Sequence, residues 1–585
     1  MTPPAPKTGA PALQARRVVK RFAQKHRAVD ALKGVDLTLA PGKVTGLIGP
    51  DGAGKTTFLR IAAGLMLPDG GTVSVLGMDT ATRALEVQAV IGYMPQRFGL
   101  YGDLTVQENL TLYANLQGVS AAEREQRFPE LMNMTGLGPF TSRLARFLSG
   151  GMKQKLGLAC TLVRAPRLLL LDEPTVGVDP VSRRELWDIV YRLVGEEGMT
   201  VLLSTAYMDE AERCDRVALI HQGNLLGHRP PAEFSARMQG RVYTAAVPEG
   251  GSKRGLQQRL STVPGAVDAV IQGERVRLVM ASGQQPRGDA VQGLELEPSE
   301  PRFEDSFVDA LRDGEALVSS TTDDRGQASA APEGETVIRV QGLTRRFGNF
   351  EAVRNLSFEV GRGEVFGLLG ANGAGKSTTF RMLCGLLPAS AGHLSVAGVN
   401  LRTAAAAARQ RLGYVSQRFA LYGNLTVRQN LRFFASAYNL RRRQREERIR
   451  WAINSFELAD MADADSETLP LGYKQRLALA AALMHGPDIL FLDEPTSGVD
   501  PLARREFWTW INRLSGQGVT VLITTHFLEE ADYCDRLAIM AAGELLAVGT
   551  PRAVKEQVAE SGRLPTMEEA FISLIERHAA PREAS

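Results

Sequence analysis

The stretch "GPDGAGKTT", residues 49–57, decides the fold of this 585-residue chain. Its spacing, G-x-x-x-x-G-K-[ST], follows a strand-like run, "VTGLIG", and precedes a helix-like run. Glycines in such a loop let backbone N–H groups wrap phosphate groups, and the helix N-terminus adds positive potential. We therefore expect Lys55 to reach the β- and γ-phosphates of a nucleotide and Thr56 to bind Mg²⁺.

The whole motif set occurs twice. A second loop, "GANGAGKST", begins at Gly370. "YMPQRFGLYGDLTVQENL" at 93–110 returns as "YVSQRFALYGNLTVRQNL" at 414–431, and "LLLLDEPTVGVDP" at 168–180 returns as "ILFLDEPTSGVDP" at 489–501. A Gly-rich turn with a chance lysine would not recur in the same strand–loop–helix context. The order of these repeats predicts two homologous domains.

Each copy contains an apolar run that ends in two acids, Asp172-Glu173 and Asp493-Glu494. A buried strand that ends in a carboxylate can hold Mg²⁺, which assigns metal binding to the two aspartates. The adjacent glutamate suits a base or a positioner for an attacking water. The alternative is a strand end with solvated acids, and the phosphate loops upstream disfavour it.

The region between the copies has a different character. Residues 229–312 carry β-like runs, "RVYTAAV" and "RVRLVMA", around a helix-like "GLQQRLS", and we expect a small α+β extension of the first copy. Ser, Thr, Asp, Gly and Ala dominate the next stretch, which predicts a flexible linker. The predicted domains are a disordered N-terminus at 1–15, a first copy at 16–228, the extension at 229–312, the linker at 313–335, a second copy at 336–550 and a short tail at 551–585.

Composition excludes several classes of protein. The formal net charge of +3 does not point to nucleic acid. The longest apolar runs fall far short of the roughly 20 residues that a membrane-spanning helix needs. The N-terminus, "MTPPAPKTGAPALQARR", has no apolar centre and is not typical of a secretory signal. The four cysteines show no metal-ligand spacing, which favours a reducing, cytosolic compartment.

Together these motifs resemble the ABC ATPase family, in which "LSGGMKQ" at 148–154 is the signature loop. The resemblance covers 16–228 and 336–550. "STAYMDEAERCDR" and the tails at 301–312 and 565–577 are similar to exporters of the daunorubicin-resistance kind. The resemblance implies an α/β fold with two P-loop NTPase cassettes, each with a mixed or parallel β core and a helical subdomain. It also implies ATP and Mg²⁺ as cofactors, and ATP hydrolysis coupled to transport.

The resemblance assigns roles to matching positions. Gln96 and Gln417 match a glutamine that contacts Mg²⁺ or water. Asp179 and Asp500 match an aspartate that reaches across the interface between cassettes. The residues expected to be catalytic are Glu494, His526 and Glu173. Those expected to bind Mg²⁺ are Thr56, Gln96, Asp172, Ser377, Gln417 and Asp493. Those expected to bind nucleotide are Gly49, Asp51, Gly52, Gly54, Lys55, Thr56, Thr57, Gln96, Ser149, Gly150, Gly151, Gly370, Asn372, Gly373, Gly375, Lys376, Ser377, Thr378, Gln417, Gly472, Phe22 and Phe347.

Two of these assignments depend on details of the sequence. Phe22 and Phe347 match the aromatic residue that stacks on adenine, but a four-residue insertion follows Phe22, and a plain core phenylalanine is the alternative there. His526 matches the switch histidine that contacts the γ-phosphate. The equivalent position in the first copy is Ala206.

The second signature loop is altered to "LPLGYKQ", residues 469–475. Pro470 lacks a hydroxyl and an N–H, and Leu471 adds bulk where glycine lets the backbone approach. In the family, two cassettes pair head to tail, and each signature loop faces the other cassette's phosphate loop. Pro470, Leu471 and Ala206 then fall in one site, which we expect mainly to hold ATP, while the other site hydrolyses it.

The leading hypothesis is the ATP-hydrolysing subunit of an exporter. It would lie peripherally on the cytoplasmic face of the inner membrane, bound to separate transmembrane permease subunits. A periplasmic adaptor protein is an optional further partner of such an exporter. The alternative is a ribosome-associated translation factor of the ABC-F kind. That class uses a basic linker, whereas residues 229–335 contain 12 basic and 17 acidic side chains, the wrong sign for neutralising RNA phosphates. A third class, the DNA-repair ATPases, is disfavoured because the sequence shows neither the coiled-coil insert nor the zinc insert of that class.

Overall fold

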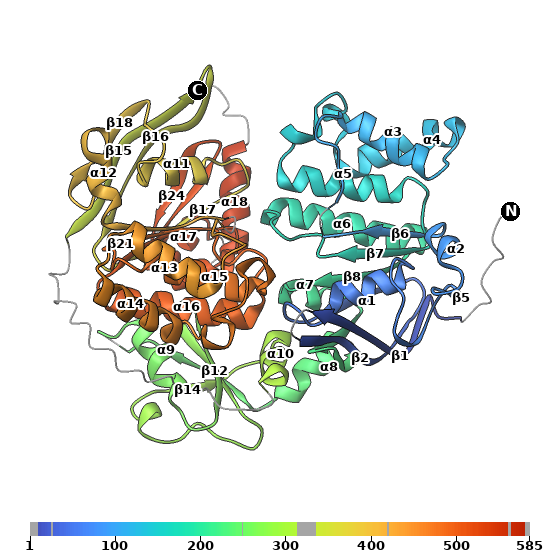
Figure 1. Cartoon of the computed structure of the whole chain (residues 1–585), viewed down its shortest axis with the longest axis horizontal. Coiled ribbons are helices and arrows are strands. Elements are labelled where there is room, and N and C mark those ends of the chain that lie inside the picture. Colours follow the sequence, from blue (N-terminus) through green and yellow to red (C-terminus); the bar gives the residue numbers. More distant parts are fainter. Residues whose placement is uncertain are drawn as a thin grey trace. The chain divides into compact units, whose positions relative to one another are not determined.

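The computed structural model describes residues 10–24, 27–96, 98–248, 250–312, 335–417, 420–559 and 563–579. These residues form two compact units (Figure 1). The first holds the described residues up to Val242 and from Ser299 to Arg312. The second holds Tyr243–Pro298, hereafter the extension, and the described residues from Glu335 onward. The region predicted at 229–312 is thus divided between the two units.

Two of the predicted boundaries, those of the linker and of the N-terminus, can be compared with the described residues. The linker predicted at 313–335 lies outside the described residues apart from Glu335, and so does the N-terminus up to residue 9. The prediction of disorder up to residue 15 is wrong for its last residues. Leu13 and Ala15 are buried because they begin a strand paired on both sides, and they pack into the core of the first unit.

A six-stranded sheet forms the centre of the first unit, in the order β10-β9-β3-β8-β7-β6. All strands are parallel except β10, which pairs antiparallel with β9. The strands are β3 (Val44–Ile48), β6 (Ile91–Met94), β7 (Leu168–Asp172), β8 (Thr200–Thr205), β9 (Arg216–His221) and β10 (Asn224–Arg229). A second, antiparallel sheet has the order β2-β1-β4-β5. Its strands are β1 (Leu13–Gln24), β2 (Arg27–Leu39), β4 (Gly70–Val75) and β5 (Met78–Asp79).

The helices of the first unit include a separate helical subdomain, formed by α3, α4 and α5, which pack on one another. The α-helices are α1 (Lys55–Ala62), α2 (Ala84–Gln88), α3 (Val106–Leu116), α4 (Ala121–Thr135), α5 (Gly150–Leu162), α6 (Pro180–Glu197), α7 (Met208–Glu212), α8 (Pro231–Ser235) and α10 (Phe303–Leu311). A capping box opens α3, because Thr105 accepts from the Glu108 N–H and Glu108 accepts from the Thr105 N–H.

The second unit repeats this architecture. Its six-stranded sheet has the order β20-β21-β22-β17-β23-β24, and its antiparallel sheet the order β16-β15-β18-β19. The strands are β15 (Thr336–Phe347), β16 (Phe350–Gly361), β17 (Val365–Gly370), β18 (Ala391–Val396), β19 (Val399–Asn400), β20 (Leu412–Val415), β21 (Ile489–Asp493), β22 (Thr520–Thr525), β23 (Arg536–Ala541) and β24 (Glu544–Gly549). The helices are α11 (Lys376–Leu383), α12 (Leu401–Arg409), α13 (Val427–Ala437), α14 (Arg442–Ser455), α15 (Leu471–Ala482), α16 (Pro501–Gly516), the 3₁₀ helix η7 (Leu528–Tyr533), α17 (Pro551–Glu556) and α18 (Met567–Ala579).

The extension forms its own four-stranded sheet in the order β12-β13-β11-β14, with one helix, α9. Its elements are β11 (Val242–Ala246), α9 (Lys253–Ser261), β12 (Ala266–Gln272), β13 (Arg275–Met280) and β14 (Leu296–Pro298). Two of the strands and the helix lie where the sequence predicted them. A small apolar core between α9 and the sheet holds the extension together.

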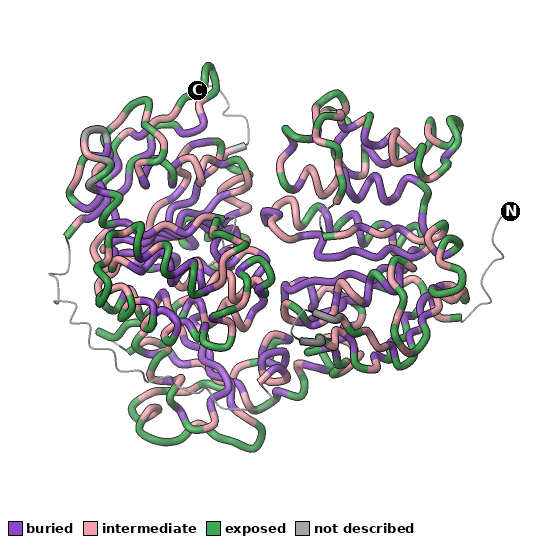
Figure 2. Tube along the Cα trace, viewed as in Figure 1, coloured by how far each residue is buried: buried purple, intermediate pink, exposed green. Residues whose placement is uncertain are grey.

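The central parallel strands are buried along their whole length (Figure 2). Every residue of β7 and β21 is buried, as expected for strands covered on both faces. Their apolar stretches therefore end in acids at the edge of a rigid core. Across the described residues, no helix is long and apolar enough to span a membrane.

Candidate functional site

The loops before α1 and α11 have a backbone that only glycine permits at one position. Gly54 has φ +107°, and a Cβ there would lie 2.4 Å from the Ala31 carbonyl oxygen. Gly375 has φ +100°, and its Cβ would lie 2.6 Å from the Ala352 oxygen. No side chain caps either helix N-terminus within the described structure. The first-turn N–H groups of both helices are therefore suited to bind an anion.

The loop lysines are buried and fold back over their loops. Lys55 Nζ donates to the carbonyl oxygens of Gly49 at 2.8 Å and Pro50 at 3.2 Å. Lys376 Nζ donates to Gly370 at 2.6 Å and Ala371 at 3.1 Å. Both ammonium groups therefore lie inside the loop, where phosphates would sit. The other predicted loop residues lie beside them, in the loops themselves or in the first turn of α1 and α11: Asp51, Gly52, Thr57, Asn372, Gly373, Ser377 and Thr378.

Asp172, the last residue of β7, is held in place by two hydroxyls. Its Oδ1 accepts from Thr56 Oγ1 at 3.1 Å and from Ser204 Oγ at 2.7 Å. Its Oδ2 is buried and makes no hydrogen bond to any described residue. A hydroxyl beside a carboxylate oxygen with spare coordination capacity fits Mg²⁺, which takes one or two protein oxygens and completes its shell from phosphates and water. The residues present therefore fit the metal that the sequence predicted.

The catalytic-candidate glutamates share an unusual backbone. Glu173 has φ +50° and Glu494 has φ +46°, in the left-handed region that non-glycine residues seldom enter. The Glu173 N–H donates to Ser204 Oγ, and the Glu494 N–H to Thr524 Oγ1, each at 2.9 Å. Strain of this kind persists only where surrounding bonds impose it, and it is common at functional sites.

Sequence reasoning missed these two hydroxyl residues. Ser204 and Thr524 each hold the aspartate and the following glutamate N–H at once, because Thr524 Oγ1 also donates to Asp493 Oδ1 at 2.7 Å. A signal for them existed: both lie near the end of the parallel strand next to the acidic one, β8 or β22. Register places their side chains beside the acids.

The glutamines lie against the glutamates. Gln96 Nε2 donates to Glu173 Oε2 at 2.6 Å, and Gln417 Nε2 donates to Glu494 Oε2 at 2.7 Å. Their predicted contact with Mg²⁺ stays a prediction. The observed bonds tie each glutamine loop, which follows β6 or β20, to the residue predicted to act on water.

The second copy adds a histidine to this group. His526 Nδ1 lies 3.2 Å from Glu494 Oε2, and both side chains are almost completely buried. Burial would raise the pKa of Glu494, but the hydrogen bond from His526 and the nearby ammonium group of Lys376 hold it below its ordinary value. Burial raises the pKa of the adjacent Asp493. Glu494 is thus kept as a carboxylate, the form that accepts a proton.

The first copy lacks this contact. Ala206 is buried and contributes only a methyl group at the position of His526. Glu173 is instead 3.3 Å from Lys55, compared with 3.9 Å between Glu494 and Lys376. The two sites therefore share their acids, hydroxyls and glutamines but differ in what accompanies the glutamate.

The signature loops also differ. Ser149 caps α5, its hydroxyl accepting from the Met152 N–H at 3.2 Å. Gly151 is in close contact with α6, since a Cβ would lie 2.4 Å from Ser182. Pro470 occupies the capping position of α15 and makes no side-chain cap, yet the helix still begins at Leu471. The substitutions change the chemistry of the helix N-terminus and leave the helix itself in place.

The aromatic candidates sit in different surroundings. Phe347 is 47% exposed, with the Arg345 guanidinium 4.6 Å from its ring centre. Phe22 is partly buried, with Lys20 Nζ 5.7 Å from its ring centre. Asp179 and Asp500 cap α6 and α16 by accepting from backbone N–H groups of the first turn. Stacking on adenine and reach across cassettes stay predictions.

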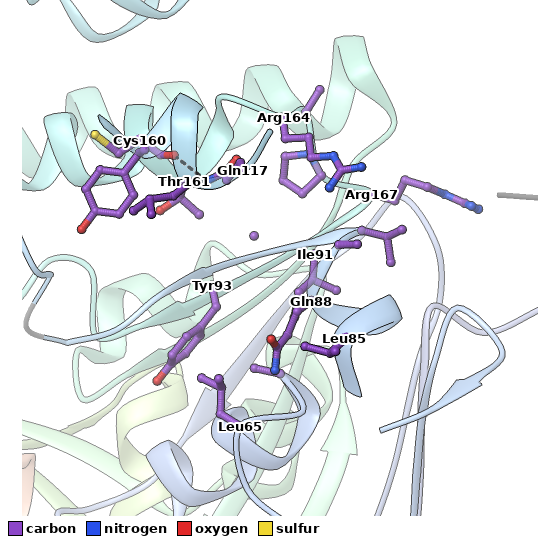
Figure 3. A pocket seen from close by; sticks show the side chains of 18 of the residues that line it. Leu65, Leu85, Gln88, Ile91, Tyr93, Gln117, Cys160, Thr161, Arg164 and Arg167 are labelled. Carbon is purple, nitrogen blue, oxygen red and sulfur yellow. Dashed lines mark hydrogen bonds between the residues drawn. The ribbon is translucent and has the colours of Figure 1, made fainter. Parts of the chain in front are cut away.

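A cavity of about 540 Å³ lies beside the glutamine loop of the first cassette (Figure 3). Its walls come from the segment after α1 and from α2, β6, α3 and α5, and they include Leu65, Leu85, Tyr93, Leu116 and Arg164. At the equivalent positions of Gln117 and Arg164, the second cassette has Tyr438 and His485, whose rings stack at 3.8 Å. The two cassettes thus present different surfaces beside their glutamine loops.

Fold and site together define a P-loop ATPase with two nucleotide-binding cassettes. A family model described as "ABC transporter" matches residues 32–176 and 353–497. The chain is 52% identical over 550 residues to the probable multidrug ABC transporter ATP-binding protein YbhF of Escherichia coli strain K12, an alignment that covers 93% of this chain and 95% of that protein.

Other relatives match one or both cassettes. The daunorubicin/doxorubicin resistance ATP-binding protein DrrA of Streptomyces peucetius is 40% identical over 236 residues, covering 40% of this chain and 70% of that protein. A putative ABC transporter ATP-binding protein of Bifidobacterium longum is 29% identical over 576 residues, covering 93% and 67%. The chain belongs to the ABC transporter family, as an ATP-binding, ATP-hydrolysing component with two cassettes.

Proposed function

We propose that this chain powers an exporter of the multidrug type, joined to separate membrane permease subunits at the cytoplasmic face of the inner membrane. The observation that carries the proposal is the cavity beside β6, whose lining is largely apolar and includes side chains as exposed as Leu85 at 81% and Leu116 at 71%. Exposed apolar side chains around a cavity are typical of a surface that binds another protein. The printed names of YbhF and DrrA support the transport assignment.

The cavity also explains how a partner would influence hydrolysis. Tyr93 and Phe98, on either side of the glutamine loop, line it, and Gln96 between them donates to Glu173. A helix seated in the cavity would press on the segment that positions the glutamate. The ribosome-associated alternative is less favoured, since the relatives aligned along nearly the whole chain are named as transporter components.

We further propose that the two ATP sites are unequal. In the head-to-tail pairing that the family resemblance implies, the loop at Lys376 with Glu494 and His526 would use the intact Ser149 signature. The loop at Lys55 with Glu173 and Ala206 would use the altered Pro470 signature. When bound, Mg²⁺ would neutralise phosphate charge; Thr56 and Asp172, or Ser377 and Asp493, would hold it.

Each residue in the proposed hydrolytic site then has a task. Glu494, kept ionised, accepts a proton from the attacking water, and Gln417 fixes its orientation. His526 lies beside the same carboxylate, and in this proposal it contacts the γ-phosphate, as the family resemblance implies. Lys376 and the N–H groups of α11 balance the charge that develops there. Any periplasmic adaptor would contact the permease subunits rather than this chain.

Attachment through the cavity is testable with matched surface leucines. The full chain is co-expressed with the membrane proteins encoded beside it, and membranes are washed in high salt. We expect the wild type to remain bound and Leu116→Asp to lose about tenfold in attachment, since a charge would be buried at the interface. Leu226→Asp, at a leucine 42% exposed on β10 outside the cavity, should bind as the wild type does. Co-sedimentation with ribosomes instead of membranes would contradict the exporter.

A further inference from the structure

The extension is encoded between the cassettes, and its buried polar groups contact the second one. Asp268 on β12 forms an ion pair with Arg505 on α16, and their side chains are 5% and 12% exposed. The Gly273 N–H donates to Asp532 of η7 at 3.0 Å. Charged groups that are this buried and paired belong to a specific interface, because an unpaired charge would be costly there.

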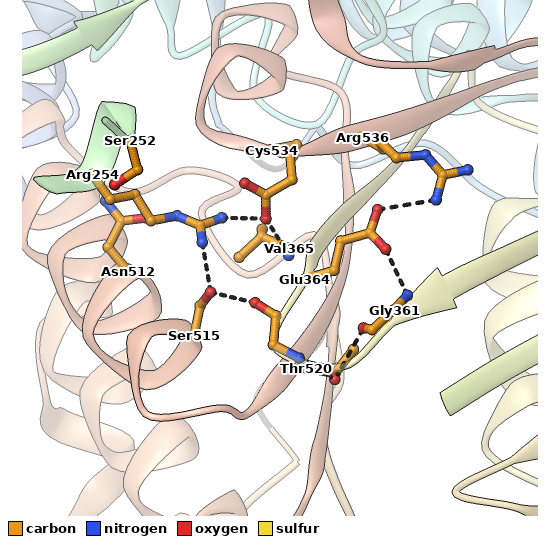
Figure 4. A network of polar contacts seen from close by, with 12 residues as sticks. Ser252, Arg254, Gly361, Glu364, Val365, Asn512, Ser515, Thr520, Cys534 and Arg536 are labelled. Atoms are coloured by element: carbon orange, nitrogen blue, oxygen red, sulfur yellow. Dashed lines mark hydrogen bonds and ion pairs between the residues drawn. The ribbon is translucent and has the colours of Figure 1, made fainter. Parts of the chain in front are cut away.

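Further polar bonds join α9 to the last turns of α16 (Figure 4). Arg254 donates to Ser515 Oγ and to Asp535 Oδ2, each at 2.6 Å. Asn512 Nδ2 donates to Gln257 Oε1 at 3.0 Å. Ser515 in turn donates to the Gly363 carbonyl oxygen at 2.6 Å. The contacts run along one side of α16, from its second turn to its end.

The elements that the extension holds are those that follow two functional residues. Asp500 caps the start of α16, and η7 begins two residues after His526. Tyr533, the last residue of η7, stacks on Trp508 of α16, with ring centres 4.8 Å apart and planes 20° apart. The same tyrosine packs against the apolar core of the extension. One side chain thus joins α16, η7 and the extension.

A short route leads from this interface to the histidine. Arg504, next to Arg505, lies 4.1 Å from the Phe527 ring centre and 3.9 Å from Glu530. Glu530 accepts from Thr525 Oγ1 at 2.6 Å, on the other side of His526. The turn that carries His526 is therefore clamped between β22 and α16, whose outer side the extension covers.

The matching surface of the first cassette carries different residues. Arg184 matches Arg505, but it is exposed. Val194, Tyr191 and Arg213 stand where the second cassette has Ser515, Asn512 and Tyr533. Asp535 and Asp532 do have acidic counterparts, Asp215 and Glu212. The hydroxyl, amide and tyrosine contacts with the extension are found in the second copy, whose glutamate has the histidine.

We propose that the extension is a positioning domain for the second cassette, which holds α16 and η7 so that Asp500 and His526 keep their working geometry. Asp268 and Arg505 are positioning residues, since they act through these elements and lie outside the nucleotide site. The inference rests on the proposed function in one respect, that the site of Glu494 and His526 does the hydrolysis. The docking itself stands on the contacts alone.

The test compares Asp268→Asn and Arg505→Gln with Arg184→Gln, in the full chain assembled with its permeases. Amide hydrogen exchange of 502–505 and 528–533 reports the docking, while ATP turnover and nucleotide affinity report the site. We expect exchange about tenfold or more faster and kcat about tenfold lower in the first two variants, with nucleotide affinity within about twofold of wild type. Arg184→Gln should leave all three unchanged, because its side chain is exposed.

Two further variants keep the proposal open to contradiction. Asp268→Leu with Arg505→Met replaces the buried pair by apolar groups and should restore slow exchange and turnover. Arg254→Ala removes peripheral bonds, leaves the pair, and should give the same changes at about a third of the size or less. Unchanged exchange, unchanged kcat despite faster exchange, or equal loss of kcat and affinity would each overturn the proposal. If Glu494→Gln keeps full turnover, the proposed function fails instead, and the exchange data still decide the docking.

Discussion

The two cassettes build the same site around different companions of the glutamate. In both, a hydroxyl on the neighbouring strand holds the aspartate and the glutamate N–H, and a glutamine contacts the carboxylate. Only the second places a histidine beside that carboxylate, while the first has Ala206. The contacts that place the acids are thus the same in both cassettes, whereas the group beside the glutamate differs. If our proposal of unequal sites holds, one fold separates nucleotide binding from hydrolysis.

The largest expected effect comes from removing the carboxylate in the second site. Glu494→Gln keeps the size and the contact with Gln417 but cannot accept a proton. We expect steady-state ATP hydrolysis by the assembled complex to fall by roughly 10²–10⁴-fold, the usual contribution of a general base. The measurement is phosphate release at saturating Mg-ATP.

The same change in the first site provides the comparison. Glu173→Gln should leave at least about half of the turnover, since in our proposal the first site contributes little to hydrolysis by the wild-type complex. Equal losses in both variants, with nucleotide binding intact, would show that the two sites hydrolyse alike.

Removing the histidine should have the next largest effect on the rate. His526→Ala makes the second site resemble the first, and one charge-stabilising donor is worth about 10²–10³-fold in rate. We expect a loss at the lower end of this range in kcat, with the affinity for ATP unchanged, because the loop of Lys376 stays intact. A change confined to KM would assign His526 to ground-state binding.

Repairing the first site is the converse experiment. Ala206→His, Pro470→Ser and Leu471→Gly are combined in the Glu494→Gln background, where only the first site can report. We expect turnover to rise about tenfold or more over that background, with Ala206→His alone giving little, since two missing contacts each limit the rate. Glu173, Lys55 and Asp172 are already placed to act. No gain from the triple variant, with binding and assembly intact, would mean that other differences silence the site.

How far the sequence predicts this molecule depends on the range of the interaction. The phosphate loops and acidic strands follow from local patterns, and the structure has them at the expected residues, with Asp172 and Asp493 as the last residues of β7 and β21. Aligning the two copies showed that Ala206 occupies the position of His526, but the contact of His526 with Glu494 was not predicted from the sequence. Residues that act across strands, such as Ser204 and Thr524, have no motif of their own.

The extension shows where local patterns stop. Two of its strands and its helix could be predicted from short runs of sequence, but its docking could not. Asp268 is one acid in an acidic segment, and Arg505 one of two adjacent arginines on a helix. Only the fold shows that they are buried against each other. Chain order assigned the segment to the first copy, and long-range pairing assigns it to the second unit.

The smallest expected effect compares the two signature helices. Ser149 caps α5 by accepting from the Met152 N–H, whereas Pro470 at the start of α15 has no group to do so. Ser149→Ala should therefore lower the free energy of unfolding of the first cassette by about 1 kcal/mol, the usual value of such a cap. Pro470→Ala should change the stability of the second cassette by less than half of that, because no cap is lost. Urea unfolding, followed by hydrogen exchange at the first turns of α5 and α15, separates the two. A larger loss at Pro470 would show that proline stabilises the altered loop by restricting the unfolded chain. The absence of the serine cap would then be compensated structurally in the second cassette.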